Sequence, residues 1–417
     1  MDTKNPTNSK TFCYLPFGSI HVTPKGVLHP CCMSAPFEDG IVWDDFDSID
    51  DLYNSEPYRR IRKQMVSNEE PKECKVCFEL GSDFRENNNK MYNEFAKAKD
   101  LVNDDFTINK LTYVDLRLSN MCNFMCRMCS HELSSSWYDY WEYISGQSNY
   151  KHNNPKFLVA SKTGVGKLSE TNIDTIRKIY LAGGEPFITP QTFELLDRFN
   201  DEQARKVEVL INTNLSTLSY KGRDILKELS RFKYITIACS IDGVNEVGEY
   251  QRPGFKTSRF ERNFKTLLDA AESNNKFFVE IDCTVSTMNV FHLPDFLSYL
   301  NSNFPNFSIN NFRLHSVYYP FYFSCSAFSD ELLDKVSDML FNLKVTYKQH
   351  GSFVESVRLL SNSIFVNRKA DYLEHNRSQL HVSLPKVLKT FDDLHNTDYK
   401  KVCPWLDDIM YGGKTLL

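Results

Sequence analysis

Three cysteines lie close together in the segment CNFMCRMC, at Cys122, Cys126 and Cys129. Cysteine thiolates hold iron–sulfur clusters, and a cubic cluster has four irons that each need an outer ligand. Three cysteines would leave one iron open, and a metal with an open position can bind a small molecule directly, as catalytic zinc sites do. The alternatives for this spacing are a zinc loop or three buried thiols.

Five more cysteines fall in the first 80 residues, which indicates a second site: Cys13, Cys31, Cys32, Cys74 and Cys77. The polar start MDTKNPTNSK lacks the apolar core of a signal peptide, so we expect a cytoplasmic protein. In a reducing compartment, metal binding or catalysis explains twelve cysteines better than a disulfide framework does.

The composition is that of a globular protein. The chain has 417 residues, of which 41% are hydrophobic and 25% charged, and this excludes the disordered classes. A formal net charge of -5 provides no basic field for a phosphate backbone, so nucleic-acid binding is disfavoured. Apolar runs are too short to span a bilayer, so we expect no membrane association.

From residue 110 onward, short apolar strand candidates alternate with helical stretches. The strand candidates are TYVDLRL, IRKIYLAG, VEVLINT, YITIACSI, FFVEIDCTV and NNFRLHSV, and the helical stretches are 190–200, 220–231, 259–274 and 291–302. Such alternation predicts an α/β fold with a parallel sheet, and six units can form a partial (β/α)6 TIM-type barrel. The cysteine trio follows the first of these strands, at the carboxyl end where such barrels build their active sites.

The two ends of the chain differ from the barrel. The segment SIHVTPKGVLHPCC predicts two short strands, and SIDDLYNSEPYRRIRKQMV predicts a helix that begins at Ser48. After residue 329 the pattern is mainly helical. We therefore divide the chain into a cysteine-containing region at 1–105, a barrel at 106–325 and a helical region at 326–417.

The trio and four later motifs resemble the radical S-adenosylmethionine (SAM) superfamily, whose signature is Cys-x3-Cys-x2-Cys after the first barrel strand. The motif GGEP resembles the segment that binds the SAM amino group, NTN and SIDG resemble contacts to its ribose and carboxylate, and the arginine of YQRPG resembles a support for the carboxylate. The residue before the last cysteine is often aromatic in the family and is Met128 here. The resemblance thus implies a cofactor site of Met128, Gly183, Gly184, Glu185, Asn212, Asn214, Ser240, Asp242 and Arg252.

The resemblance also implies a mechanism. The trio would hold a [4Fe-4S] cluster, and its open iron would bind SAM. Reductive cleavage of SAM would give a 5′-deoxyadenosyl radical, which abstracts a substrate hydrogen. An electron donor such as flavodoxin or ferredoxin is the implied partner. The cofactor supplies the difficult chemistry, while the protein orients the substrate.

The early cysteines resemble the twitch (half-SPASM) type of auxiliary-cluster region, which in most relatives follows the barrel but here precedes it. The resemblance implies an auxiliary [4Fe-4S] cluster on Cys13, Cys31, Cys74 and Cys77, with Cys32 as a substitute for Cys31. A structural zinc is the alternative, because a Cys-x2-Cys pair with two distant cysteines is also zinc spacing.

Three functional classes follow. The first is a radical SAM enzyme of oxidoreductase type that oxidatively modifies a peptide or protein, since SPASM and twitch relatives often act on such substrates. The second is the same chemistry on a small molecule such as a sugar, alcohol or nucleotide. The third is a non-enzymatic iron–sulfur or zinc scaffold.

Overall fold

The computed structural model of the chain describes residues 9–79, 85–87, 89–90, 102–146, 149–162, 164–317, 319–366, 384 and 386–407. Parts of the two predicted end regions lie outside the described residues. They are 1–8, 80–84 in the segment after Cys77, 88 and 91–101 before the barrel, and 367–383, 385 and 408–417 in the C-terminal region.

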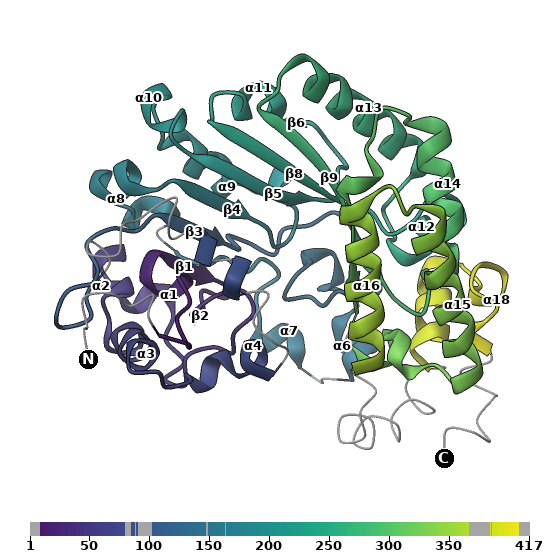
Figure 1. The fold of residues 1–417 in the computed structure, drawn as a ribbon, viewed down its shortest axis with the longest axis horizontal. Helices are drawn as coiled ribbons and strands as arrows, with labels where there is room; N and C mark the ends of the chain where they lie inside the picture. The colour runs from purple at the N-terminus through teal and green to yellow at the C-terminus, as the bar shows by residue number, and fades with distance from the viewer. Residues whose placement is uncertain are drawn as a thin grey trace.

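Six parallel strands form the centre of the fold, and all six were predicted from the sequence. They pair in chain order: β3 (Tyr113–Leu116), β4 (Lys178–Leu181), β5 (Glu208–Thr213), β8 (Tyr234–Ser240), β9 (Phe277–Val285) and β10 (Phe312–Ser316). The sheet curves without closing, as Figure 1 shows. The predicted α/β fold with a partial barrel is confirmed.

An N-terminal hairpin extends this sheet to eight strands. Strand β1 (Ser19–Val22) pairs antiparallel with β2 (Leu28–His29) and parallel with β3, giving the order β10-β9-β8-β5-β4-β3-β1-β2. The sequence predicted the hairpin but not its union with the barrel. The hairpin of the cysteine-containing region and the barrel therefore share one continuous sheet.

Helices connect the barrel strands. In Figure 1, α8 (Glu170–Thr175), α10 (Asp201–Ala204), α11 (Ile225–Leu229), α13 (Thr257–Ser273) and α14 (Leu293–Asn303) follow one another around the outer edge of the sheet. The remaining helices of the barrel region are α9 (Pro190–Asp197) and α12 (Asn245–Gln251). Helix α13 is amphipathic and buries Phe260, Phe264 and Leu267.

One predicted helix, at 220–231, is only partly correct. Its first residues form a hairpin of β6 (Ser219–Tyr220) and β7 (Arg223–Asp224), and α11 begins after it. The two residues between these strands, Lys221 and Gly222, have φ values of 47° and 81°. Positive φ at both central residues is the geometry of a tight two-residue hairpin turn, which ends any helix there.

The helix predicted from Ser48 is two helices, α2 (Ile49–Tyr53) and α3 (Glu56–Val66). Ser48 caps the first, since its hydroxyl accepts a hydrogen bond from the Asp51 backbone N–H at 3.1 Å. Pro57 has no N–H to donate to the Tyr53 carbonyl, so the helix cannot continue. The guanidinium of Arg62 donates to that carbonyl instead.

Short elements complete the N-terminal region and the segment between β3 and β4. The first set is α1 (Leu15–Gly18), η2 (Trp43–Asp45), η3 (Lys72–Cys74) and α4 (Lys75–Glu79). The second set is η5 (Ser135–Trp137), α6 (Trp141–Ser145), α7 (Tyr150–Asn153) and η6 (Gly164–Lys167).

The C-terminal part is helical, as predicted, with α15 (Asp330–Thr346), α16 (Gly351–Val366) and α18 (Tyr399–Val402) beside the β10 end of the sheet (Figure 1). The Ser356 hydroxyl of α16 accepts a hydrogen bond from the Leu314 N–H of β10 at 2.7 Å. Within the described ranges, no helix combines the length and the apolar character needed to cross a bilayer.

Candidate functional site

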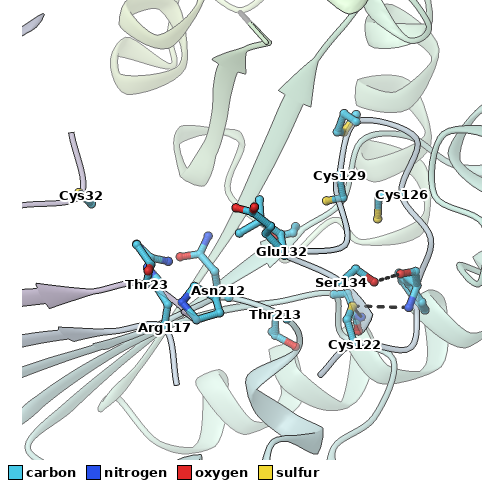
Figure 2. A pocket seen from close by; sticks show the side chains of 18 of the residues that line it. Thr23, Cys32, Arg117, Cys122, Cys126, Cys129, Glu132, Ser134, Asn212 and Thr213 are labelled. Carbon is cyan, nitrogen blue, oxygen red and sulfur yellow. Dashed lines mark hydrogen bonds between the residues drawn. The ribbon is translucent and has the colours of Figure 1, made fainter. Parts of the chain in front are cut away.

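A cavity of about 670 Å³ lies at the carboxyl ends of the barrel strands (Figure 2). Most of the predicted cofactor residues line it: Cys122, Cys126, Met128, Cys129, Gly183, Gly184, Asn212, Asn214, Ser240 and Arg252. Because parallel strands end at the same edge of a sheet, motifs far apart in sequence meet here. Two predicted residues, Glu185 and Asp242, are buried outside the lining.

Hydrogen bonds within the cysteine loop and to neighbouring segments fix its backbone. The Cys129 N–H donates to the Cys126 carbonyl at 2.9 Å, and the Met125 N–H donates to the Pro253 carbonyl at 2.8 Å. The Ser134 hydroxyl donates to the Phe124 carbonyl at 2.6 Å, and the Trp137 indole N–H donates to the Cys126 carbonyl at 3.2 Å. The loop that carries the three thiols is therefore anchored to Pro253 and to the segment that contains Ser134 and Trp137.

The thiols of the loop differ in their environments. Burial raises the pKa of Cys122 to about 12. The pKa of Cys126 is lowered, first by a hydrogen bond with Cys129 and then, against its burial, by the charge of Arg252. The charge of Arg252 thus favours the thiolate form of Cys126.

The motif GGEP needs its glycines. Gly183 and Gly184 have φ values of 82° and 55°, a region that disfavours other residues. A Cβ atom on Gly184 would lie 2.3 Å from the Met121 carbonyl oxygen. The tight turn therefore brings the GGEP backbone directly against the start of the cysteine loop.

Glu185 links three motifs from beneath the cavity. Its carboxylate accepts hydrogen bonds from the Thr213 hydroxyl at 2.7 Å and from the backbone N–H groups of Asn214 at 2.6 Å and Phe187 at 3.0 Å. Its own backbone N–H donates to the Met121 carbonyl at 2.7 Å. Burial raises the pKa of this carboxyl to about 7, although these hydrogen bonds oppose the shift. Glu185 positions the motifs around it.

Asp242 and Arg252 form a buried ion pair at the cavity floor. The Arg252 Nε donates to Asp242 Oδ2 at 2.5 Å, and the second Asp242 oxygen accepts from the Thr284 N–H at 2.8 Å. Burial acts to lower the pKa of Arg252, but Asp242 and the Cys126 thiolate outweigh it and the pKa is raised. Arg252 thus remains a fixed cation beside the trio.

The four best early cysteine candidates meet at a second, small cavity. Cys13, Cys31, Cys74 and Cys77 line it together, and all four are buried. Cys32 lines the large cavity instead and lies across it from the trio in Figure 2. The structure thus separates the adjacent pair and groups Cys31 with the other three.

The donor set of the small cavity fits an iron–sulfur cluster. All four donors are cysteines, whose thiolates are the protein ligands of iron–sulfur clusters. Burial raises the pKa of Cys13 to about 12 and that of Cys31 to about 11, so a bound metal would have to draw the protons off these thiols. Among the described residues, no three His, Cys, Asp or Glu side chains come close enough to share one metal ion. A cubic cluster does not need such convergence, because each cysteine binds a different iron.

One wall of the large cavity was not predicted from the sequence. The N-terminal hairpin contributes His21, Lys25 and His29 to the lining, and β3 is followed by Arg117. His21 Nδ1 lies 2.9 Å from an oxygen of Asp115 on β3. A histidine and an aspartate inside apolar strands were a possible signal, but their meeting depends on a strand pairing that sequence patterns did not reveal.

Comparisons with protein families agree with this geometry. The model described as the radical SAM superfamily matches residues 116–292. The chain carries a radical SAM domain. The model described as an iron–sulfur cluster-binding domain, SPASM, matches residues 13–78, so the SPASM region precedes the radical SAM domain. A radical SAM domain implies a [4Fe-4S] cluster and SAM, and the SPASM region implies a further iron–sulfur cluster.

Two curated relatives of the radical SAM domain are distant. The chain is 22% identical over 288 residues to the radical SAM cyclopropyl synthase TigE of Paramaledivibacter caminithermalis, covering 67% of this chain and 56% of that protein. It is 21% identical over 259 residues to a probable GTP 3′,8-cyclase of Methanocaldococcus jannaschii, covering 60% of this chain and 77% of that protein. The chain thus spans little more than half of the first relative.

Similar solved structures include anSMEcpe with bound AdoMet, at 17% identity and a TM-score of 0.36, covering 56% of this chain and 61% of that one. Streptococcus suis SuiB bound to S-adenosylmethionine is 14% identical with a TM-score of 0.31, covering 79% of this chain and 68% of that one.

Proposed function

We propose that this protein cleaves SAM reductively in the large cavity and oxidatively modifies a peptide or protein. The observation that carries the proposal is the convergence on one cavity of the cysteine trio, the GGEP turn and a polar wall from the SPASM region. Cys122, Cys126 and Cys129 would hold the cluster. When bound there, the cluster and SAM supply a 5′-deoxyadenosyl radical that removes one hydrogen atom from the substrate.

The strand ends supply groups that could bind SAM. Gly183 and Gly184 let the GGEP turn pack tightly against Arg117 and Met121, and both glycines line the cavity where their backbone can contact a ligand. Asn212, Asn214 and Ser240 present amide and hydroxyl groups to the cavity, where they can bind the ribose and the amino acid part of SAM. Met128 adds apolar surface next to them. These side chains would orient the cofactor when it is bound.

The opposite wall provides a base. His21 Nδ1 lies 2.9 Å from the Asp115 carboxylate, and in the neutral imidazole a proton on Nδ1 leaves the lone pair on Nε2. Arg117 Nε lies 3.2 Å from the other Asp115 oxygen. We assign to His21 Nε2 the proton that a substrate loses when it is oxidised.

Removal of two hydrogens from a substrate then leaves every atom and electron accounted for. One hydrogen leaves as an atom and becomes part of 5′-deoxyadenosine, the other leaves as a proton to His21, and one electron remains. Cys13, Cys31, Cys74 and Cys77 would hold the group that takes this electron. A cluster with four protein ligands supplies an electron acceptor rather than a substrate-binding site, since no iron stays open.

A small-molecule substrate is the second candidate. A peptide is favoured by the resemblance to SPASM and twitch proteins, which often act on peptides. The similarity to a probable GTP 3′,8-cyclase favours a nucleotide or another small molecule instead.

Mass analysis of the product tests the substrate and the type of reaction. The reconstituted enzyme is incubated with SAM, dithionite and either the short peptide encoded nearest to its gene or a panel of nucleotides and sugars. We expect a peptide product that is lighter by two hydrogens. A modified nucleotide or sugar would support the second candidate, and a product of unchanged mass would contradict the oxidative proposal.

A further inference from the structure

Arg252 contacts the sulfur of one cysteine in the trio. Its Nη1 donates to Cys126 Sγ at 3.6 Å, within the range of hydrogen bonds to sulfur. The arginine side chain is only 10% exposed and that of Asp242 is fully buried. The resemblance assigned Arg252 to the SAM carboxylate, but that assignment does not account for this contact.

The guanidinium is fixed in place from behind. Asp242 binds Arg252 Nε, and Asp242 is itself held by the Gln251 amide at 3.0 Å and the Thr284 N–H at 2.8 Å. A planar guanidinium held at one N–H has little freedom to turn its other N–H groups away. The position of its charge relative to Cys126 is therefore set by the fold.

A second sulfur of the trio also receives hydrogen bonds. The Phe124 N–H donates to Cys122 Sγ at 3.5 Å, and the Asn214 amide donates to the same sulfur at 3.9 Å. These donors are neutral, whereas Arg252 is charged. Arg252 is therefore the donor with the largest electrostatic effect on the trio.

We propose that Arg252 is a positioning residue that makes the trio's cluster easier to reduce by acting through the Cys126 sulfur. This proposal rests on the proposed function, since it requires that the trio holds the cluster. Hydrogen bonds to the sulfurs and the local net charge are among the features that set the reduction potential of a cluster. A fixed cation at a cysteine sulfur stabilises the more negative, reduced form, and a buried setting screens that effect less than water does. A SAM carboxylate would use other N–H groups of the same guanidinium.

Redox titration followed by electron paramagnetic resonance tests the proposal on the reconstituted full chain. The signal that changes when SAM is added reports the trio's cluster and not the auxiliary one. Three variants separate charge from hydrogen bonding: Arg252→Met removes both, Arg252→Gln keeps an N–H donor without the charge, and Arg252→Lys keeps the charge without the planar fork. Iron content is measured for each.

Arg117→Met is the matched control. Arg117 lines the same cavity and is ion-paired with Asp115, but within the described residues it makes no hydrogen bond to a trio sulfur. We expect it to leave the midpoint potential of the SAM-sensitive signal close to that of the wild type.

At the wild-type midpoint, we expect the ratio of reduced to oxidised cluster to fall about tenfold in Arg252→Met, which corresponds to about 59 mV for one electron. Arg252→Gln should shift in the same direction, and Arg252→Lys less. If the Arg252→Met protein loses iron, the midpoint potential of Arg252→Gln tests the proposal instead. Variants with normal iron and an unchanged midpoint would overturn the proposal, as would an equal shift in Arg117→Met. A wild-type protein without any SAM-sensitive signal would instead contradict the proposed function.

Discussion

His21 and Asp115 are direct partners in the parallel pairing of β1 with β3, and their side chains meet at 2.9 Å. One residue belongs to the SPASM region and the other to the strand that leads into the cysteine trio. Both are buried, at 6% and 3% exposure. A buried charge is tolerated when it is paired, and this pair lies where the two cysteine-containing regions join. The SPASM region thus contributes directly to the wall of the large cavity.

The His21 imidazole should be needed for product formation but not for SAM cleavage. In His21→Gln, we expect product formation to fall by about 10²- to 10⁴-fold, the usual contribution of a general base. Formation of 5′-deoxyadenosine should continue, so the ratio of product to 5′-deoxyadenosine falls. Both compounds are quantified in one chromatographic run with the identified substrate.

His29→Gln is the matched control for that prediction. His29 lines the same wall, but its Nδ1 contacts the Ser34 carbonyl rather than a carboxylate. The loss in this variant should be far smaller. Equal losses in both variants would contradict the assignment of the base to His21.

Substitution of Cys31 and substitution of Cys32 should change the iron content differently. Reconstituted wild-type protein should carry about eight irons, two cubic clusters' worth. Cys31→Ala should lose up to about four of them, because Cys31 lines the small cavity with the other three cysteines. Cys32→Ala should keep them all, because its side chain faces the large cavity.

Iron analysis and visible absorption spectra measure this difference. Stoichiometric zinc in the wild-type protein, with the iron of only one cluster, would refute an iron–sulfur site at the small cavity. Loss of iron in Cys32→Ala but not in Cys31→Ala would show that the two positions are assigned the wrong way round.

Substitution of Gly184 should distort the cofactor site. Gly184→Ala places a Cβ against the Met121 carbonyl and forces a left-handed backbone on alanine, which costs about 1–2 kcal/mol before any clash. We expect a lower melting temperature and weaker SAM binding, measured by thermal unfolding and calorimetry. Gly166→Ala is the control, since no atom lies within 4 Å of its added Cβ. If Gly184→Ala binds SAM as tightly as the wild type, the GGEP turn is not part of the SAM site.

Much of the barrel could be predicted from the sequence, because each buried strand is a short apolar run that can be recognised between helical stretches. The errors came from local backbone chemistry. The Lys221–Gly222 turn replaced the start of a helix, and Pro57 divided another helix in two. Neither effect changes the apolar pattern, so periodicity alone does not reveal it.

The site was only partly predictable for a different reason. Motifs such as GGEP carry their chemistry in consecutive residues and could be recognised directly. The His21–Asp115 pair and the Arg252–Cys126 contact join residues that are distant in sequence, and both depend on strand register or loop position. The separation of Cys31 from Cys32 likewise depends on which way the chain turns after β2.

We propose that SAM is cleaved in the large cavity at a cluster held by Cys122, Cys126 and Cys129. The most direct measurement is 5′-deoxyadenosine formed by anaerobically reconstituted protein with SAM and dithionite, for the wild type and for Cys126→Ala. The wild type should form it and the variant should not, while Cys32→Ala retains the activity. A wild-type protein that binds iron but never yields 5′-deoxyadenosine, or a Cys126→Ala variant that yields as much as the wild type, would contradict the claim.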